Sequence, residues 1–332
     1  MTPAQLSSTM GVDGADQSVP SIPGPAAGSP DDDRKPHVSI STTTEREIRS
    51  QPEVWARAVA AADQGAPVLG RRGERVLLLG CGTSAFVAES VAVLRERAGY
   101  GETDAAYASE WRPGRTYDRV VVISRSGTTS EVLEALAQVP AGTVRAAVVG
   151  VAGTPVAEAA DETLVLDFAD EESVVQTRFP TSVLALARTG FGENLGPVIE
   201  RAAEVLAAPL PVDPSRFDHF VFLGRSWSYG LAQEAALKIR EAAQAWSESY
   251  PALDYRHGPL AVAGEASLVT LFGDADPVLA ADIERTGATV QHWDLDPLIQ
   301  LVQAQRLAVE LAGSRGLDAD APRHLTRSVV LG

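Results

Sequence analysis

Short apolar runs alternate with helix-like stretches along most of this chain, and this alternation constrains the fold more than any other feature. In the first half, RVLLLG (75–80) precedes a helical stretch from Ala85 to about Glu96, and RVVVIS (119–124) precedes TSEVLEALAQV. VRAAVVGV and TLVLDF follow as two more strand candidates. Strands this continuously apolar are typical of parallel sheets covered by helices on both faces. The pattern therefore predicts an α/β fold.

The second half repeats the scheme. FVFLG (220–224), SLVTLFG (267–273) and TVQHWDL (289–295) are the strand candidates there. A long helix is expected from about Ser228 to Trp246, and a final one from Pro297 to Gly313. We therefore expect a second parallel sheet flanked by helices.

One turn motif occurs in both halves. LLLGCGTSAFVAES around Gly80 and FVFLGRSWSYGLAQEA around Gly224 share a strand, a glycine, three residues and a serine, with an offset of 144 residues. A repeat at this spacing suggests two tandem copies of one α/β unit, although two unrelated strand-turn-helix units can share such a pattern by chance. Gly and Pro concentrate in GFGENLGP and APLPVDPSR, which predicts the boundary near residues 190–215.

Composition separates a tail from the folded part. Residues 1–36 are rich in Ser, Pro, Gly, Ala and Asp and have almost no large apolar side chains, so we expect them to be disordered. Helix-entry residues Thr44 and Glu45 predict that order begins close by. The expected organisation is a disordered tail (1–36), a first domain (37–195) and a second domain (196–332).

Charge and residue usage exclude several classes of function. A net charge of -16 argues against a non-specific grip on nucleic acid or on an anionic membrane surface. No run of about 18 apolar residues and no secretory signal pattern is present, so we expect no membrane contact and a cytoplasmic location. The lone Cys81 allows no internal disulfide, and with the five histidines it shows no metal-ligand spacing. We therefore expect no metal.

Two hydroxyl-rich turns follow strands of the first half. These are Gly80-Cys81-Gly82-Thr83-Ser84 and Ser124-Arg125-Ser126-Gly127-Thr128-Thr129. In open parallel sheets, ligands bind beyond the carboxyl ends of the strands, where helix N-termini present free N–H groups. Glycines permit close backbone approach, and Ser and Thr hydroxyls donate to anionic oxygens. Together the turns describe a phosphate cradle.

Helix capping is the alternative explanation for either turn, because Ser and Thr are preferred N-cap residues. Capping needs one hydroxyl, whereas residues 124–130 contain five in seven positions, and this surplus favours a ligand. Neither turn matches the dinucleotide fingerprint or the nucleotide P-loop, so no cofactor is expected.

These residues carry a resemblance to a known family. SRSGTTSEV after VVVI, with GCGTS one strand earlier, resembles the sugar isomerase (SIS) fold. GLAQEAALKIREAAQAWSESYPALDYRHGPLAV (230–262) and DADAPRHLTRSVVL (318–331) resemble the isomerase half of glucosamine-6-phosphate synthase and the related amino-sugar-phosphate deaminase/isomerases. The likeness covers roughly residues 44–332. It implies two SIS-type units and an amino-sugar-phosphate substrate.

The resemblance also assigns roles to residues. It implies that Glu241 moves a proton between C1 and C2 of the sugar, and that His257 opens the ring in the active site of a neighbouring subunit, hence a homodimer. The implied substrate contacts are Cys81, Gly82, Thr83 and Ser84 for the sugar, Ser124, Arg125, Ser126 and Thr129 for the phosphate, and Val174 and Gln176 along the pocket.

The chemistry of these residue types supports the role of Glu241 independently. Enediol chemistry needs a base that takes a proton from one carbon and returns it to the next, and a carboxylate with a raised pKa suits this. Glu234 lies two helical turns before Glu241 and should project from the same face, with Lys238 close enough to pair with either. A solvated helix carboxylate is the alternative for Glu241, and a structural turn histidine is the alternative for His257.

The chain also departs from the family pattern. The synthase's glutaminase domain is not found at the N-terminus, so no ammonia is expected to be made from glutamine. Arg327 stands where the synthase has an active-site lysine in its tail; an arginine forms no Schiff base but could clamp substrate oxygens. Arg125 replaces a neutral amide and suggests a different substrate.

The sequence thus predicts an enzyme that converts a phosphorylated amino sugar, releasing ammonia or an amino acid as it makes a ketose phosphate. Two alternatives remain at this point. The same fold serves in non-catalytic sugar-phosphate sensors, for which the Arg327 replacement would be an argument. A simple aldose–ketose isomerase without deamination is the other.

Overall fold

The computed structural model describes residues 42–331, which belong to one compact unit. The tail expected to be disordered at 1–36 lies outside the described residues. Order begins with helices α1 (Thr43–Arg49) and α2 (Gln51–Ala60). The Thr42 hydroxyl caps α1 by accepting a hydrogen bond from the backbone N–H of Glu45.

The first sheet has five parallel strands in the order β2-β1-β3-β4-β5. Their bounds are β1 Val76–Gly80, β2 Thr103–Tyr107, β3 Arg119–Ser124, β4 Val144–Val149 and β5 Glu162–Val165. The central strands β1 and β3 are buried along their whole length, as their apolar runs predict.

The second sheet has four parallel strands in the order β7-β6-β8-β9. Their bounds are β6 His219–Gly224, β7 Trp246–Pro251, β8 Ser267–Leu271 and β9 Thr289–His292. The predicted α/β fold with parallel sheets is therefore confirmed.

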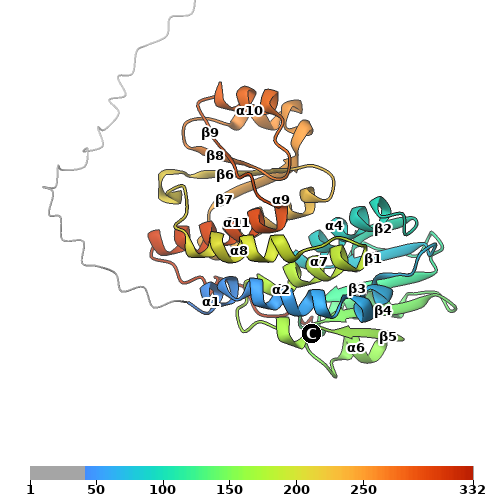
Figure 1. Cartoon of the computed structure of the whole chain (residues 1–332). Coiled ribbons are helices and arrows are strands. Elements are labelled where there is room, and N and C mark those ends of the chain that lie inside the picture. The colour runs from blue at the N-terminus through green and yellow to red at the C-terminus, as the bar shows by residue number, and fades with distance from the viewer. Residues whose placement is uncertain (1–41, 332) are drawn as a thin grey trace, which may run out of the picture. The chain divides into compact units, whose positions relative to one another are not determined.

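A layer of helices separates the two sheets (Figure 1). The largest apolar cluster joins both sheets through α2, α4 (Thr83–Arg97), α7 (Arg178–Gly190), α9 (Ser228–Ala243) and α11 (Pro297–Ser314). Helices α5 (Ser130–Ala137) and α6 (Pro155–Ala159) cover the outer face of the first sheet. Helix α10 (Pro277–Glu284) covers the outer face of the second. Both sheets are thus buried on two faces.

The sequence missed or misplaced several elements. The edge strands β2 and β7 were not expected, and the helix predicted to run to Trp246 ends at Ala243. Gln244, in a left-handed conformation with φ 49°, terminates α9, and Trp246 then begins β7. Helices α7, α8 (Gly196–Ala207) and α10 were also not expected. Helix α8 lies between the two Gly- and Pro-rich segments that suggested a boundary.

Within residues 42–331, every helix is too short or too polar to cross a bilayer.

Candidate active site

A cavity of about 220 Å³ lies beyond the carboxyl ends of β1 and β3. In the order β2-β1-β3, β2 lies on one side of β1 and β3 on the other, so the order of the strands along the chain reverses between β1 and β3. Open α/β sheets bind ligands at such a point. Helix α9 and the C-terminal segment complete the walls. Eleven residues singled out from the sequence line it: Cys81, Gly82, Thr83, Ser84, Ser124, Arg125, Ser126, Thr129, Val174, Gln176 and Glu241; Arg327 of the tail lines it as well.

The first turn brings the N-terminus of α4 to the cavity. A Cβ atom on Gly80 would lie 2.5 Å from the backbone carbon of Ser84, so only glycine fits there. Gly82 then adopts φ 52°, a conformation that glycine reaches without strain. Thr83 and Ser84 begin α4 and are buried, and the Ser84 hydroxyl has no hydrogen-bond partner among the described residues. It remains available to a ligand.

The second turn places several donors around the same space. The Ser124 hydroxyl lies 3.4 Å from that of Thr129 and accepts a hydrogen bond from the Gly127 backbone N–H. Gly127 has φ 65°, and its missing Cβ would overlap the side chain of Thr154. The backbone N–H groups of Ser126 and Thr129 have no acceptor within the described part of the chain. These donors are uncharged and point to an anionic ligand.

The C-terminal segment packs against this turn. Ser126 donates a hydrogen bond to the Ser328 hydroxyl at 3.1 Å, and Thr128 and Ser328 share a contact of 2.8 Å. The backbone N–H of Ser130 donates to the carbonyl of Val329. The Ser328 hydroxyl therefore occupies a position at which the hydroxyls of the second turn could contact a ligand.

The two arginines at the cavity are engaged by the protein itself. Arg125 is buried, and its guanidinium donates to the carbonyls of Ser173 at 2.6 Å and Arg327 at 2.7 Å. Burial lowers the pKa of Arg125 from its usual value. Arg327 donates to the carbonyl of Glu171 and pairs with Asp170 at 2.5 Å. In this arrangement both arginines tie the tail to the cradle.

One face of α9 carries a carboxylate–lysine–carboxylate series, as its spacing predicts. The Lys238 ammonium lies 2.5 Å from Glu241 Oε2 and 3.3 Å from Glu234 Oε1. It also donates to the Thr83 hydroxyl at 3.3 Å, which joins α9 to the first turn. Lys238 and Glu234 are fully buried, whereas the Glu241 side chain keeps 18% of its surface exposed and faces the cavity.

Burial and neighbouring charges shift the pKa values of Glu234 and Lys238 for different reasons. Burial raises the pKa of Glu234 to about 7, against the opposing effect of Lys238. For Lys238, burial favours the neutral form, but Glu234 and Glu241 outweigh it and raise the pKa. The raised carboxylate pKa expected of a base is therefore found at Glu234, which lies behind Glu241.

The loop before α7 supplies another wall. Val174 and Gln176 both line the cavity, and the amide oxygen of Gln176 is buried with no donor among the described residues. A buried oxygen of this kind favours a ligand or water that donates to it. Leu237, Leu325, Thr326 and Val329 also line the cavity and were not singled out from the sequence.

Two predicted site residues do not line the cavity. Lys238 is buried outside the lining and contacts two residues of it, Glu241 and Thr83. His257 is exposed at the end of the 3₁₀ helix Ala252–His257 and is not in the wall. A role for His257 in catalysis would need a second copy of the chain.

Among residues 42–331, no group of three or more His, Cys, Asp or Glu side chains is placed to hold a metal ion. Burial, together with the charge of Glu131, raises the pKa of the Cys81 thiol to about 11, so this cysteine is a thiol at neutral pH.

Comparisons with known proteins agree with this architecture. The chain is similar to the glutamine–fructose-6-phosphate aminotransferase of Gloeobacter violaceus, with 28% identity over 78% of this chain and 52% of the relative. The enzyme of the same name from Aquifex aeolicus is 25% identical over 86% of this chain and 57% of its own length. The chain thus spans about half the length of these curated relatives.

Solved structures extend the likeness across almost all of the described residues. The glucosamine-6-phosphate deaminase of Thermotoga maritima is 27% identical with a TM-score of 0.78, covering 87% of this chain and all of that one. The tagatose-6-phosphate ketose/aldose isomerase of Escherichia coli has a TM-score of 0.71 at 21% identity, with 84% and 95% coverage, and shares the fold.

Residues 71–188 match the SIS domain family, and they contain the first sheet with both hydroxyl-rich turns. The fold, the site and these likenesses lead to the same conclusion. Residues 71–188 therefore form a SIS domain, and the chain that contains it is similar to glutamine–fructose-6-phosphate aminotransferases and to a glucosamine-6-phosphate deaminase.

Proposed function

We propose that this protein is an amino-sugar-phosphate deaminase/isomerase. One observation carries the proposal: the uncharged donors of Ser124, Ser126 and Thr129 and the carboxylate of Glu241 line a single cavity. Phosphosugar isomerisation needs a binding site for the phosphate and a base that transfers a proton, and this one cavity offers candidates for both.

The residues that line the cavity support the following proposed roles. Ser124, Ser126 and Thr129 hold the phosphate with hydroxyls and free backbone N–H groups. Thr83 and Ser84 contact the sugar from the start of α4, and Gln176 receives a sugar hydroxyl on its unpaired amide oxygen. The segment carrying Ser328 moves to admit the phosphate, and Arg327 clamps substrate oxygens once it is released from Asp170.

The reaction balances without an oxidant or a cofactor. Glu241 removes the proton from C2 of the open-chain amino aldose and returns it to C1, while the aldehyde oxygen O1 gains a proton and the amine nitrogen loses one, both by exchange with water. The carbon skeleton then holds an imine at C2, which adds water and expels ammonia. The products are one ketose phosphate and one ammonia for each amino-aldose phosphate and water consumed. Lys238 keeps Glu241 oriented toward the cavity through their 2.5 Å contact.

The likeness to the Thermotoga maritima deaminase supports deamination over aminotransfer, because that protein is matched along its whole length. We also propose that the two sheets belong to two tandem SIS units, at 37–195 and 196–332. The active form is a cytoplasmic homodimer in which His257 reaches the cavity of the neighbouring copy and opens the sugar ring.

The experiment is the substitution Glu241→Gln. With glucosamine 6-phosphate as substrate, the wild type should release ammonia and fructose 6-phosphate in equal amounts. The variant should lose about 10²- to 10⁴-fold in kcat, because the amide cannot accept the proton, and should still bind the substrate in calorimetry.

Glu284→Gln is the matched control, since Glu284 is exposed at the end of α10 and has no ion pair or side-chain hydrogen bond among the described residues. A wild type that binds the sugar phosphate without turnover would identify a sensor instead. Interconversion of glucose 6-phosphate and fructose 6-phosphate, with no ammonia from the amino sugar, would identify a simple isomerase.

A further inference from the structure

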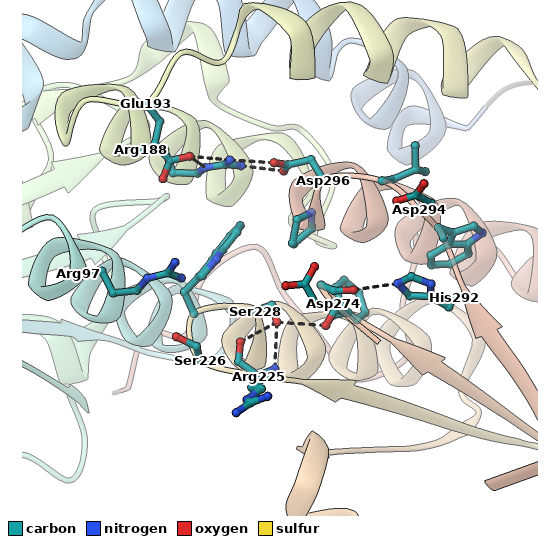
Figure 2. A pocket seen from close by; sticks show the side chains of 16 residues that line it. Arg97, Arg188, Glu193, Arg225, Ser226, Ser228, Asp274, His292, Asp294 and Asp296 are labelled. Carbon is teal, nitrogen blue, oxygen red and sulfur yellow. Dashed lines mark hydrogen bonds and ion pairs between the residues drawn. The ribbon is translucent and has the colours of Figure 1, made fainter. Parts of the chain in front are cut away.

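A second and larger cavity, of about 740 Å³, lies beyond the carboxyl ends of β6, β8 and β9 (Figure 2). Residues 225–228 follow β6, residues 272–274 follow β8, and residues 292–294 comprise the last residue of β9 and the two after it; all three segments line the cavity. Arg97 and Arg188 reach it from the helices α4 and α7 of the first half. The proposed reaction uses none of these residues.

The position of this cavity repeats that of the candidate active site. The second sheet has the order β7-β6-β8, so it reverses direction between β6 and β8 as the first sheet does between β1 and β3. The turns also match in detail. A Cβ atom on Gly224 would lie 2.3 Å from the carbonyl oxygen of Ser228, and Ser226 has φ 59° where the first turn has Gly82 at 52°.

The charges of the lining differ from those of the first site. Arg188 is fully engaged, because it donates to both carboxylate oxygens of Asp296 at 2.7 and 2.8 Å and to Glu193 at 2.9 Å. Its guanidinium also lies over the ring of Trp227. This group therefore shapes the wall and offers no free charge to a ligand.

Four other charged side chains line the cavity without a partner. Arg97, Arg225, Asp274 and Asp294 make no side-chain hydrogen bond or ion pair within residues 42–331. In Figure 2, Arg97 and Asp274 extend toward the same space from opposite sides. The open charges are thus two cations and two anions.

The presence of two cations and two anions in the lining favours one class of ligand over others. A simple sugar phosphate would meet two uncompensated carboxylates, and a simple amine would meet two uncompensated guanidinium groups. A ligand with one charge of each sign satisfies both pairs. The backbone N–H groups of Ser226 and Trp227, at the start of the 16-residue helix α9, have no acceptor among the described residues and add donors for the anionic end.

We propose that this cavity is a second ligand site, for a small polyhydroxylated zwitterion that carries a phosphate and an ammonium group. Its phosphate lies toward Arg97, Arg225 and the start of α9, and its ammonium group lies toward Asp274 and Asp294. The volume is within the range of ordinary small-molecule sites. The sugar ring lies in the part of the cavity between Trp227 and the ends of β6, β8 and β9.

The test is calorimetric titration of the full-length Glu241→Gln variant with glucosamine 6-phosphate, because the wild type is proposed to convert this substrate, and the further substitutions are made in the same background. Two binding events per chain are expected. Asp274→Asn combined with Asp294→Asn should remove one event, and Ser124→Ala combined with Ser126→Ala should weaken only the other. The control Glu284→Gln should keep both. Thermal unfolding of each variant checks that the fold is retained.

Two analogues test the ligand class in the Ser124→Ala, Ser126→Ala background. Fructose 6-phosphate lacks the ammonium group and glucosamine lacks the phosphate, so each should bind about tenfold more weakly or worse, since each loses charge-assisted hydrogen bonds. Equal affinity for fructose 6-phosphate would overturn the zwitterion assignment.

The second site is refuted if no binding event responds to the Asp274 and Asp294 substitutions. This result is separable from a failure of the proposed function. The proposed function fails when the wild type releases no ammonia from glucosamine 6-phosphate, whether or not the sugar phosphate binds at Ser124 and Ser126, and that outcome leaves the event sensitive to Asp274 and Asp294 in place.

Discussion

At the residue scale, the series Glu234, Lys238 and Glu241 combines structure and chemistry on one face of α9. The middle lysine is buried and compensates two carboxylates, of which one is fully enclosed and one faces the cavity. Such an arrangement is costly to desolvate and is stable only while its partners remain together. It holds Glu241 at the wall of the cavity, where we propose that proton transfer takes place.

The raised pKa of Glu234 gives a prediction for stability. In the unfolded chain Glu234 ionises at its ordinary pKa near 4.5, whereas in the folded chain it keeps its proton up to about pH 7. The stability from this group is therefore fully present below pH 4.5 and is lost as the pH rises through 7. Compared with Glu234→Gln, the wild type should lose stability across this window by at most about 1.4 kcal/mol per pH unit.

Urea unfolding of both proteins at several pH values between 4.5 and 7.5 measures the effect. Glu47 also has a pKa raised to about 7, by burial and by Glu171, but it is present in both proteins and its contribution cancels. A difference in stability that is constant over this range would contradict the assigned protonation of Glu234.

Residue type and spacing predicted where these side chains lie. The seven-residue spacing of two glutamates with a lysine between them fixes a common helix face, and the hydroxyl-rich second turn lies at the cavity where a phosphate cradle was expected and is now proposed. The engagement of Arg125 with the carbonyls of Ser173 and Arg327 was not predictable, because those partners lie 48 and 202 residues away in the sequence. Local pattern carries no information on such contacts.

At the element scale, helices α4 and α9 connect the two cavities. Helix α4 begins with Thr83 at the candidate active site and ends with Arg97 at the second cavity. Helix α9 begins with Ser228 at the second cavity and carries Glu241 to the first. Thr83 contacts Lys238 near one end and Ser90 donates to the Trp227 carbonyl near the other, so the helices pack antiparallel.

The closest point of this packing is at Gly230. A Cβ atom there would lie 2.2 Å from the Ser90 hydroxyl and 2.3 Å from the carbonyl oxygen of Phe86. Gly230→Ala should therefore destabilise the protein by about 1–3 kcal/mol, even though alanine favours helix formation. The free energy of unfolding in urea measures this change.

Gly313 provides the matched control. It is exposed in α11, and a Cβ atom there would contact nothing within 4 Å. Gly313→Ala should be neutral or stabilise by up to about 1 kcal/mol, through helix propensity alone. If both substitutions had the same effect on the free energy of unfolding, the close approach of α4 and α9 would be refuted.

The sequence predicted elements in proportion to the strength of their local pattern. The central strands β1, β3, β6 and β8 were found because burial on two faces makes them continuously apolar. Strand β2 reads TDAAY and is only partly buried at a sheet edge, so it lacks that signal. Strand β7 reads WSESYP and lies at the edge of the second sheet beside β6, so it lacks an apolar run and follows directly on a long helix.

At the scale of the whole molecule, the chain alone does not complete the proposed machinery. The cavity holds the cradle and Glu241, whereas His257 is exposed outside its wall. A homodimer that brings His257 of a second copy to the cavity would supply the ring-opening group. Sequence reasoning reached this expectation only through resemblance, because nothing local to His257 indicates a partner.

The central claim is that one cavity positions both the phosphate and the base. Determining a crystal structure of the full chain with glucosamine 6-phosphate tests it most directly. The account predicts phosphate oxygens at hydrogen-bond distance, about 3 Å, from Ser124, Ser126 and Thr129, with C2 next to the Glu241 carboxylate and a second copy's His257 near the ring oxygen. A sugar phosphate bound with its phosphate away from these three hydroxyls, or with C2 out of reach of Glu241, would contradict it.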